Sequence, residues 1–185
     1  MFKGPFSRRQ LGQWGLSATA VAGLGLWTGR ETLAQAQGTA PAPTPRPEAL
    51  RSEFLMDLIL ETSPAVAIGE RGDRTAVAVT GGTFEGPKLR GTVIGPGADW
   101  PLRMSDTLRI LDVRTILVTD DNQKIYMTYR GVIHTPPAGQ GSRYWRTTPI
   151  FETDSAKYRW LTELVAVGVN YTVPQRVAYR IFTIL

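Results

Sequence analysis

Between residues 109 and 134 the sequence alternates with a period of two residues, and this alternation constrains the fold more than any other feature. Residues 109–118, RILDVRTILV, and residues 124–134, KIYMTYRGVIH, are both rich in β-branched and aromatic side chains. Residues 120–123, between them, are Asp-Asp-Asn-Gln, a composition typical of a turn. An amphipathic helix would instead repeat every 3.6 residues or so, at about 100° per residue. We therefore predict an antiparallel β-hairpin over 109–134.

Further segments of the same character predict an all-β domain. They are short, evenly spaced and separated by Gly, Pro, Asp or Asn, and they cover residues 54–61, 74–80, 88–94, 142–151, 164–171 and 175–184. The helical candidate is 154–164, where Asp154 could cap a first turn. Eight or so antiparallel strands with one short helix form a barrel or a sandwich. A closed barrel leaves no strand edge open to pairing, which matters in a chain that has no cysteine and so no disulfide.

The first 36 residues are typical of an export signal and not of folded structure. Arg8 and Arg9 stand directly before an apolar stretch, 16–27, which is the twin-arginine arrangement. This stretch is too short and too rich in Gly and Ala to span a bilayer core of roughly 30 Å. Ala34 and Ala36 are small residues of the kind that a signal peptidase accepts, so we expect cleavage after Ala36 and a periplasmic or secreted protein. The alternative is an N-terminal membrane anchor that is never removed.

The chain after the predicted cleavage site divides into a tether and one domain. Residues 37–51 begin with QGTAPAPTPRPE, a Pro/Ala-rich composition that cannot build a core, and residues 52–185 have the length of a single domain. The whole chain carries a net charge of +5, but 1–36 holds four basic residues and one acidic residue, so +2 remains. The remaining arginines are interspersed with acids. We therefore expect no nucleic-acid partner and, once the signal is removed, no membrane association.

Residues that hold metals and cofactors are scarce. The chain has no cysteine for an iron–sulfur cluster or a structural zinc, and its single histidine, His134, precedes Thr135-Pro136-Pro137. A proline-flanked, extended segment leaves little choice of geometry for a Ser-His-Asp triad. We expect no metal and no cofactor, and we place His134 at a strand end in water.

The glycine-rich segment 81–100, GGTFEGPKLRGTVIGPGADW, does not match the phosphate-binding loops. A Walker-type loop has a lysine directly after its last glycine and then a helix, whereas here Pro87 precedes Lys88 and a strand follows. A dinucleotide-binding loop needs a third glycine that opens a helix, but this segment ends in Trp100 and Pro101. The glycines instead predict sharp bends, bulges and close backbone approaches in a small barrel.

Several blocks of residues resemble one known family. They are GGTFEGPKLRG (81–91), GADW (97–100), LDVR (111–114), IY (125–126), RG (130–131), YWRT (144–147), FE (151–152) and YRWL (158–161). They occur in the family's order over nearly all of 54–185, so the chain resembles domain of unknown function family 3237, also called uncharacterised protein family 0311. The resemblance implies an eight-stranded antiparallel, calycin-like barrel. Two positions depart from the family pattern: Thr162 replaces an Asn, and Asn170 replaces the second glycine of a Val-Gly-x-Gly segment.

The predicted hairpin has one polar and one mainly apolar face. The polar face carries Asp112, Arg114, Tyr126, Thr128 and Arg130, and the apolar face carries Arg109, Leu111, Val113, Leu117, Ile125, Met127, Tyr129 and Ile133. Composition favours the ordinary arrangement, in which the apolar face is buried. The family blocks, however, include Asp112, Arg114, Arg130 and Arg146. On that ground we expect the polar face to line the lumen.

A polar lumen would form a binding site for one small ligand. Arg114, Tyr126, Arg130, Tyr144 and Arg146 would converge there, and arginines suit a carboxylate or phenolate through forked hydrogen bonds. The ligand-binding candidates are therefore these five residues together with Trp100 and Trp160, whose rings could stack on an aromatic compound. The alternative for Trp160 is a helical plug that closes one end of the barrel.

Two carboxylates are the catalytic candidates. Burial of Asp99 beside the indole of Trp100 would raise the pKa of its carboxyl group toward the range useful for proton transfer. Asp112, on the polar face, is the second candidate. The bland alternative for Asp99 is a carboxylate that only caps a turn.

Two classes of function are consistent with these features. The first is an exported barrel that binds a small anionic or aromatic compound. The second is a cofactor-independent lyase, isomerase or decarboxylase, in which an Arg/Tyr cluster stabilises negative charge and Asp99 or Asp112 moves a proton. An apolar outer face on two strands would also favour a homodimer.

Overall fold

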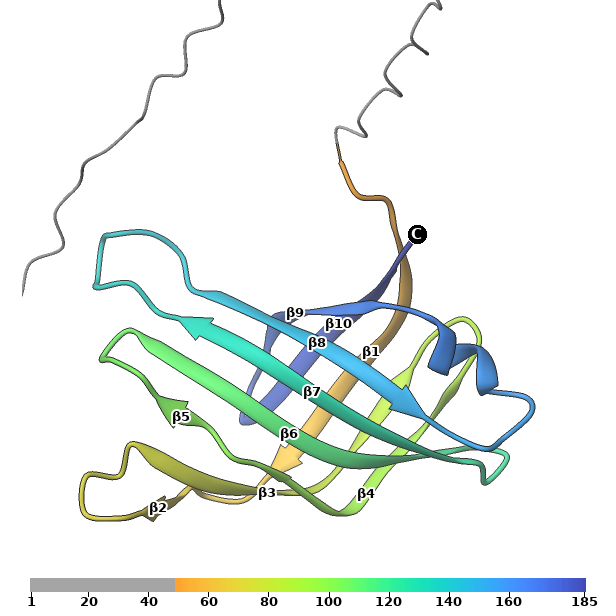
Figure 1. The fold of residues 1–185 in the computed structure, drawn as a ribbon, viewed down its shortest axis with the longest axis horizontal. Helices are drawn as coiled ribbons and strands as arrows, with labels where there is room; N and C mark the ends of the chain where they lie inside the picture. The colour runs from red at the N-terminus through yellow and green to blue at the C-terminus, as the bar shows by residue number, and fades with distance from the viewer. Residues whose placement is uncertain (1–48) are drawn as a thin grey trace, which may run out of the picture. The chain divides into compact units, whose positions relative to one another are not determined.

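The computed structural model of the chain describes residues 49–185, which fold almost entirely into β-strands (Figure 1). The strands are β1 (Ser52–Thr62), β2 (Val66–Ile68), β3 (Arg74–Glu85), β4 (Arg90–Asp99), β5 (Leu102–Arg103), β6 (Leu108–Thr119), β7 (Lys124–His134), β8 (Tyr144–Glu152), β9 (Ala166–Val173) and β10 (Arg176–Ile184). A 3₁₀ turn, η1, spans Arg159–Glu163. Within 49–185, no helix has the length and apolar character needed to cross a membrane. The predicted export signal and most of the predicted tether lie outside the described residues.

Eight of the strands close into an antiparallel barrel. Neighbouring strands follow the order β1-β10-β9-β8-β7-β6-β4-β3, and β1 also pairs with β3, which completes the ring. The short strands β2 and β5 flank it, β2 on β3 and β5 on both β3 and β6. The predicted eight-stranded antiparallel barrel is confirmed. Closure leaves no strand at the end of an open sheet, although β8 and β9 pair only through Arg146 with Val169 and Thr147 with Gly168.

The hairpin predicted from the two-residue period is β6 and β7. These strands pair over their whole length, with Asp112 opposite Arg130 and Arg114 opposite Thr128. Asn122 adopts a positive φ of 62° in the connecting turn, a conformation that asparagine tolerates better than most residues. The residues of the turn and the alternation of the two strands are therefore consistent with the same strand register.

The glycine-rich segment allows strands β1, β3, β4 and β6 to approach closely. Gly82 has a φ of 146°, and a Cβ atom there would clash with the carbonyl oxygen of Ile59. A Cβ atom on Gly91 would clash in the same way with the carbonyl oxygen of Val118. The pairing of β3 with β4 shifts register between Ala78 and Gly82. These glycines lie mainly inside the strands, where they permit the bulge and close contacts that the sequence predicts.

The expectation that the polar face of the hairpin lines the lumen is wrong. Leu111, Val113 and Met127 are buried in the core, whereas the side chains of Arg114 and Arg130 are 55% and 69% exposed. The whole predicted polar set lies on the outer surface: Asp112, Arg114, Tyr126, Arg130, Tyr144 and Arg146. An eight-stranded barrel has a narrow interior that side chains fill, and moving each unpaired ion into it would cost several kcal/mol. The apolar face is thus inside, which also removes the argument made for a homodimer.

One end of the barrel is closed by the segment that follows β8. The helix expected over 154–164 is reduced to η1, and no side chain caps it. Tyr158 and Leu161 are buried in the core. The hydroxyl of Tyr158 donates a hydrogen bond of 2.9 Å to Asp121, in the β6–β7 turn. Trp160 belongs to this segment and packs against the core. This placement agrees with the alternative considered for Trp160, a plug that closes one end of the barrel.

Candidate functional site

The barrel holds a cavity of about 180 Å³ near the end opposite η1. Strand β6 shows the direction, because it runs from Arg109 at this cavity to Thr119 beside the closed end. Leu60, Val77 and Leu111 are among the apolar side chains of the wall. Polar groups of the wall include those of Asp99, Arg109, Tyr129, Arg143, Trp145 and Tyr179. The cavity thus has apolar walls and a few polar groups, which is the usual composition of a ligand site.

Strand alternation and register place these side chains. Arg109 and Tyr129 lie on the inward faces of β6 and β7, because they are in phase with the buried Leu111 and Met127. Asp99 is the last residue of β4 and stands opposite Val113, which also faces inward. A register shift between Ile94 and Ala98 precedes it, so the end of β4 follows a different phase from its beginning. This shift could not be located from the sequence alternation alone.

Asp99 is partly buried and carries an unusual carboxyl group. Burial raises its pKa from 3.8 to about 6, although the backbone N–H of Asp112 donates a hydrogen bond of 3.1 Å to its Oδ1 atom and opposes the shift. The negative charge of Asp112 adds a smaller upward contribution. With this pKa, both the protonated and the ionised form of the carboxyl group are populated near neutral pH. Asp99 is therefore suited to giving and taking a proton.

Three aromatic side chains of the cavity wall, those of Tyr129, Trp145 and Tyr179, pack against one another. The ring of Tyr179 lies 5.6 Å from that of Tyr129 and 5.7 Å from that of Trp145, both in edge-to-face geometry. Burial raises the pKa of both tyrosines well above the ordinary value, so their hydroxyl groups stay neutral. Neutral hydroxyl groups and an indole N–H are all hydrogen-bond donors. These three residues therefore bring hydrogen-bond donors to the wall of the cavity.

Two of these donors have no partner. The Tyr179 Oη and the Trp145 Nε1 atoms are buried, and neither makes a well-formed hydrogen bond to any described residue. Tyr179 lies near enough to Tyr129 and Trp145 for them to affect its pKa, but the hydrogen-bond geometry is not met. Leaving a buried donor unsatisfied costs about 1–3 kcal/mol. Both atoms belong to residues that line the cavity, but the atoms themselves expose almost no surface.

Two arginines stand at the rim of the cavity. The guanidinium carbon of Arg143 lies 4.3 Å from the centre of the Trp145 ring, a cation–π contact. Arg109 makes no ion pair and no side-chain hydrogen bond within residues 49–185. Both side chains are exposed and both border the cavity. The rim is therefore positively charged and would attract an anion.

The structure separates the two predicted catalytic residues. Asp99 borders the cavity, but the carboxylate of Asp112 lies on the outer surface, 2.9 Å from Nη1 of Arg114 and 3.8 Å from Nη1 of Arg130. Only the backbone N–H of Asp112 reaches Asp99. Its carboxylate is therefore paired outside the barrel, away from the cavity.

The predicted ligand-binding residues lie outside the cavity. Trp100 is 42% exposed and does not line the cavity, and its carbonyl oxygen accepts a hydrogen bond of 2.6 Å from Arg74. Trp160 packs on the core at the closed end, with Nζ of Lys88 at 5.5 Å from its ring centre. Arg130, Tyr144 and Arg146 meet at a depression of the outer surface, where Arg146 also stacks on the Tyr144 ring. His134 ends β7 and is exposed.

Sequence reasoning missed most of the cavity residues. Arg109 and Tyr129 are polar exceptions on the otherwise apolar face of the hairpin, and this was the signal that could have identified them. The alternation of β8 also places Trp145 on the inward face, in phase with the buried Thr147 and Phe151. Tyr179 and Arg143 carry no comparable pattern. No group of three or more His, Cys, Asp or Glu side chains that could hold a metal ion occurs in the described part of the chain.

The fold and the cavity define a closed antiparallel β-barrel with one plugged end and one polar-lined end. Residues 50–184 match the family described as "Protein of unknown function (DUF3237)", and the chain belongs to this family. A UPF0311 protein of Rhodopseudomonas palustris is 25% identical over 149 residues, which cover 74% of this chain and 97% of that protein. The family predicted from the residue blocks is therefore confirmed.

Three further similarities carry information. A protein of Penicillium herquei named "Hydroalkoxylation enzyme phnH" is 31% identical over 126 residues, which cover 66% of this chain and 76% of that protein. A β-barrel-like protein of Acinetobacter baumannii superposes with a TM-score of 0.68 at 32% identity, covering 76% of this chain and 99% of the other. The crystal structure of an enzyme from Penicillium herquei superposes with a TM-score of 0.62 at 27% identity, covering 77% and 99%.

Proposed function

We propose that the chain binds a small anionic or aromatic molecule in the cavity beside Asp99 and transfers a proton on it, as a cofactor-independent lyase or isomerase. The observation that carries this proposal is the combination of one carboxyl group of raised pKa with two buried, unpartnered hydrogen-bond donors, Tyr179 and Trp145. Asp112 and the outer arginines are not part of the proposed machinery. The acid–base group is Asp99 alone.

The proposed chemistry follows from what each group can do. In its ionised form Asp99 removes a proton from an O–H or C–H group of the substrate. The electron pair moves onto an oxygen of the substrate, where the donors on Tyr179 and Trp145 stabilise the negative charge. Asp99, now protonated, gives the proton to a different carbon of the enolate or, when the proton came from an O–H group, to one carbon of a C=C bond while the oxygen bonds to the other carbon. No oxidant or reductant takes part, because the substrate gains and loses only protons.

The relative from Penicillium herquei supports this reaction class. Hydroalkoxylation is the addition of an O–H bond across a carbon–carbon double bond, in which the oxygen bonds to one carbon and the proton goes to the other. Such an addition needs proton transfer, for which the carboxyl group of Asp99 is suited. The size of the cavity sets a limit on the reacting part of the substrate. A cavity of about 150 Å³ accepts benzene in another protein, so about 180 Å³ suits one compact ring.

The test measures binding and proton exchange together. Hydroxylated aromatics that carry an alkene, such as 2-allylphenol and 4-coumarate, would be titrated into the protein and then incubated in D₂O. We expect binding and deuterium at a carbon of the product, and we expect Asp99→Asn to reduce the exchange rate by about 100-fold or more. Asp120→Asn is the matched control, because Asp120 is an exposed carboxylate paired with Arg90 at the closed end.

The outcomes separate an enzyme from a binding protein. Binding by the wild type without deuterium incorporation for any probe would leave a binding module and overturn the catalytic proposal. Equal exchange rates for the wild type and Asp99→Asn would show that another group moves the proton. Binding that survives cavity-filling by Val79→Trp would place the ligand elsewhere.

We also propose that the protein is exported by the twin-arginine route. Arg8 and Arg9 before the apolar stretch 16–27 support it, as does the Ala34-Gln35-Ala36 sequence. Mass spectrometry of the exported protein should give an N-terminus at Gln37, and replacement of both arginines by lysine should retain the protein in the cytoplasm. An exported chain that still begins at Met1 would contradict cleavage.

A further inference from the structure

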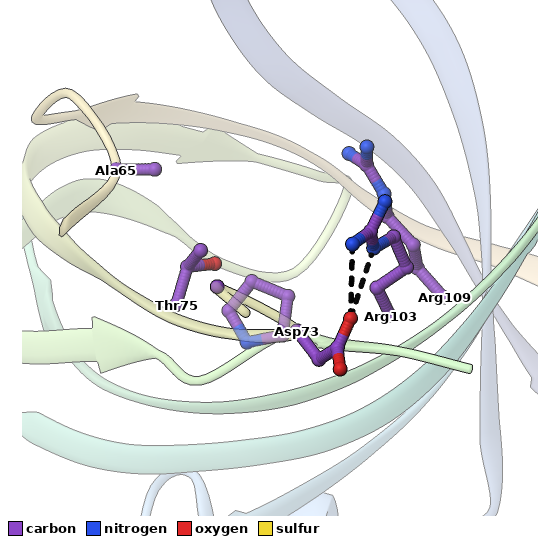
Figure 2. Close-up of a pocket in the computed structure, with 7 residues that line it drawn as sticks. Ala65, Asp73, Thr75, Arg103 and Arg109 are labelled. Atoms are coloured by element: carbon purple, nitrogen blue, oxygen red, sulfur yellow. Dashed lines mark hydrogen bonds and ion pairs between the residues drawn. The ribbon is translucent and has the colours of Figure 1, made fainter. Parts of the chain in front are cut away.

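A second, larger cavity adjoins the one beside Asp99 and opens outward. Its volume is about 410 Å³, and it is lined by Ala65, Gly72, Asp73, Thr75, Pro101, Arg103 and Arg109 (Figure 2). Pro101 and Arg109 border both cavities, so the two are neighbours with Arg109 between them. We call them the inner cavity, beside Asp99, and the outer cavity. Together they offer more room than one compact ring needs.

Two arginines face each other across neighbouring strands in the outer cavity. Arg103 in β5 is the direct register partner of Arg109 in β6. Like charges directly opposite one another on antiparallel strands are destabilising. Figure 2 shows both side chains lining the outer cavity, and of these two arginines the carboxylate of Asp73 binds Arg103. The fold thus keeps an arrangement that costs stability.

Asp73 compensates only one of these two charges. Its Oδ1 atom accepts hydrogen bonds from Nε of Arg103 at 3.2 Å and from Nη2 at 2.9 Å, and its Oδ2 atom lies 3.1 Å from Nε of Arg71. Asp106 lies 3.9 Å from Nη1 of Arg103. Within residues 49–185 no acidic group pairs with Arg109. Its guanidinium group is therefore an uncompensated charge at the boundary of the two cavities.

We propose that the outer cavity is an oxyanion subsite, in which Arg109, with Arg103 beside it, binds a carboxylate or phosphate group of the substrate while the compact part of the substrate enters the inner cavity. A guanidinium group presents parallel N–H donors that match an oxyanion in forked geometry. An anion between the two arginines would also relieve their repulsion. This inference rests on the proposed function and adds the substrate class: a two-part molecule with a compact ring at one end and an oxyanion at the other.

The first experiment compares two ligands that differ only in charge. Dissociation constants of 3-phenylpropionate and of its neutral analogue 3-phenylpropanamide would be measured for the wild type by calorimetry. We expect the acid to bind at least about 10-fold more tightly, and we expect Arg109→Gln to abolish this preference without changing the affinity for the amide. Arg109→Lys should keep part of the preference, because it retains the charge and loses the fork. Arg90→Gln, at the closed end, is the control and should behave as the wild type.

The second experiment uses the anion alone. Addition of inorganic phosphate should shift the Nε–Hε resonances of Arg103 and Arg109 in a nitrogen–proton NMR spectrum, and leave that of Arg90 in place. A variant that has lost its fold would lose its dispersed spectrum, so the same measurement controls for misfolding. Arg109→Gln should melt at the same or a higher temperature than the wild type, because it removes a like-charge contact.

The outcomes for the subsite and for catalysis are distinct. Equal affinity for the acid and the amide, or an acid preference that survives Arg109→Gln, would overturn the subsite, even if deuterium exchange at Asp99 is observed. An acid preference lost in Arg109→Gln would uphold the subsite even if no probe shows proton exchange. Absence of binding by both phenyl compounds, with no response to phosphate, would also overturn it.

Discussion

The two ends of the barrel each bury a tyrosine and hold an aspartate, and they use them in opposite ways. At the closed end the hydroxyl of Tyr158 donates to Asp121, which also binds Lys157 at 2.6 Å. At the other end the hydroxyl of Tyr179 has no partner among the described residues. Polar groups at the closed end are satisfied by one another, whereas Tyr179 Oη and Trp145 Nε1 beside the inner cavity make no well-formed hydrogen bond to a described residue. The first arrangement stabilises the fold and the second suits a ligand.

The pKa values of the two aspartates follow the same division. Bonds from Lys157, Thr119 and Tyr158 hold the pKa of Asp121 well below its usual range. Burial raises the pKa of Asp99 to about 6, because only backbone N–H groups oppose the cost of burying its charge. A paired carboxylate stays ionised at every physiological pH. A carboxyl group whose charge is buried without a cationic partner, such as that of Asp99, can exchange its proton near neutral pH.

The largest expected effect on stability concerns the plug. Leu161→Ala removes a fully buried side chain from the closed end and should lower the free energy of unfolding by about 2–5 kcal/mol. Urea unfolding would measure the change. The inner cavity lies at the opposite end, so the folded variant should bind ligands as the wild type does. A loss of stability below about 1 kcal/mol would mean that the plug does not hold the barrel closed.

A smaller effect should appear in the pH dependence of stability. The folded pKa of Asp99 is about 6 and its ordinary value is 3.8, so the folded state holds this proton more tightly than the unfolded state does. Its contribution to stability is present below pH 3.8 and is lost as the pH rises through 6. The shift corresponds to about 3 kcal/mol, which solvent screening of this partly exposed group reduces to about 1–2 kcal/mol.

Comparison of the wild type with Asp99→Asn isolates this contribution. Urea unfolding at pH 4 and pH 7.5 should show the wild type losing more stability than the variant over that interval, because the variant cannot ionise at this position. Other titrating groups contribute equally to both proteins and cancel in the difference. Parallel pH profiles for the two proteins would contradict the raised pKa.

The smallest expected effect is on stability, and it should have opposite signs when Tyr179 and Tyr158 are each replaced by Phe. Tyr179→Phe removes an unpartnered hydroxyl and should leave stability unchanged or raise it by about 1 kcal/mol, while Tyr158→Phe breaks a bond to a carboxylate and should lower it by about 1 kcal/mol. Thermal unfolding of both variants checks the pair. In the deuterium-exchange assay only Tyr179→Phe should slow the reaction. If both substitutions lowered the stability equally, the hydroxyl of Tyr179 would have a partner, as that of Tyr158 does, and the proposed difference between the two ends would be wrong.

The sequence by itself determined most of the strands, whereas closure was expected from the family resemblance and is made by the pairing of β1 with β3. The two-residue period and the turn at 120–123 specify the β6–β7 hairpin, and the glycine-rich segment marks where backbones must approach closely, because these are local properties of the chain. The alternation also sorted the side chains of this hairpin into the correct two sets. The error lay in choosing which set faces inward, where an argument from the family blocks replaced the simpler one from the free energy of burying charge.

Only the tertiary structure decided what surrounds each side chain. Asp99 was a candidate from the sequence, but its raised pKa depends on burial by other strands, and a register shift in β4 controls whether it points inward. Tyr179 and Trp145 lie on strands that are not adjacent in the barrel and meet only across its interior. The pairing of Arg103 with Arg109 likewise depends on how β5 joins β6. Pattern along the chain sets the face of a strand, whereas contacts across the barrel set the chemistry of the site.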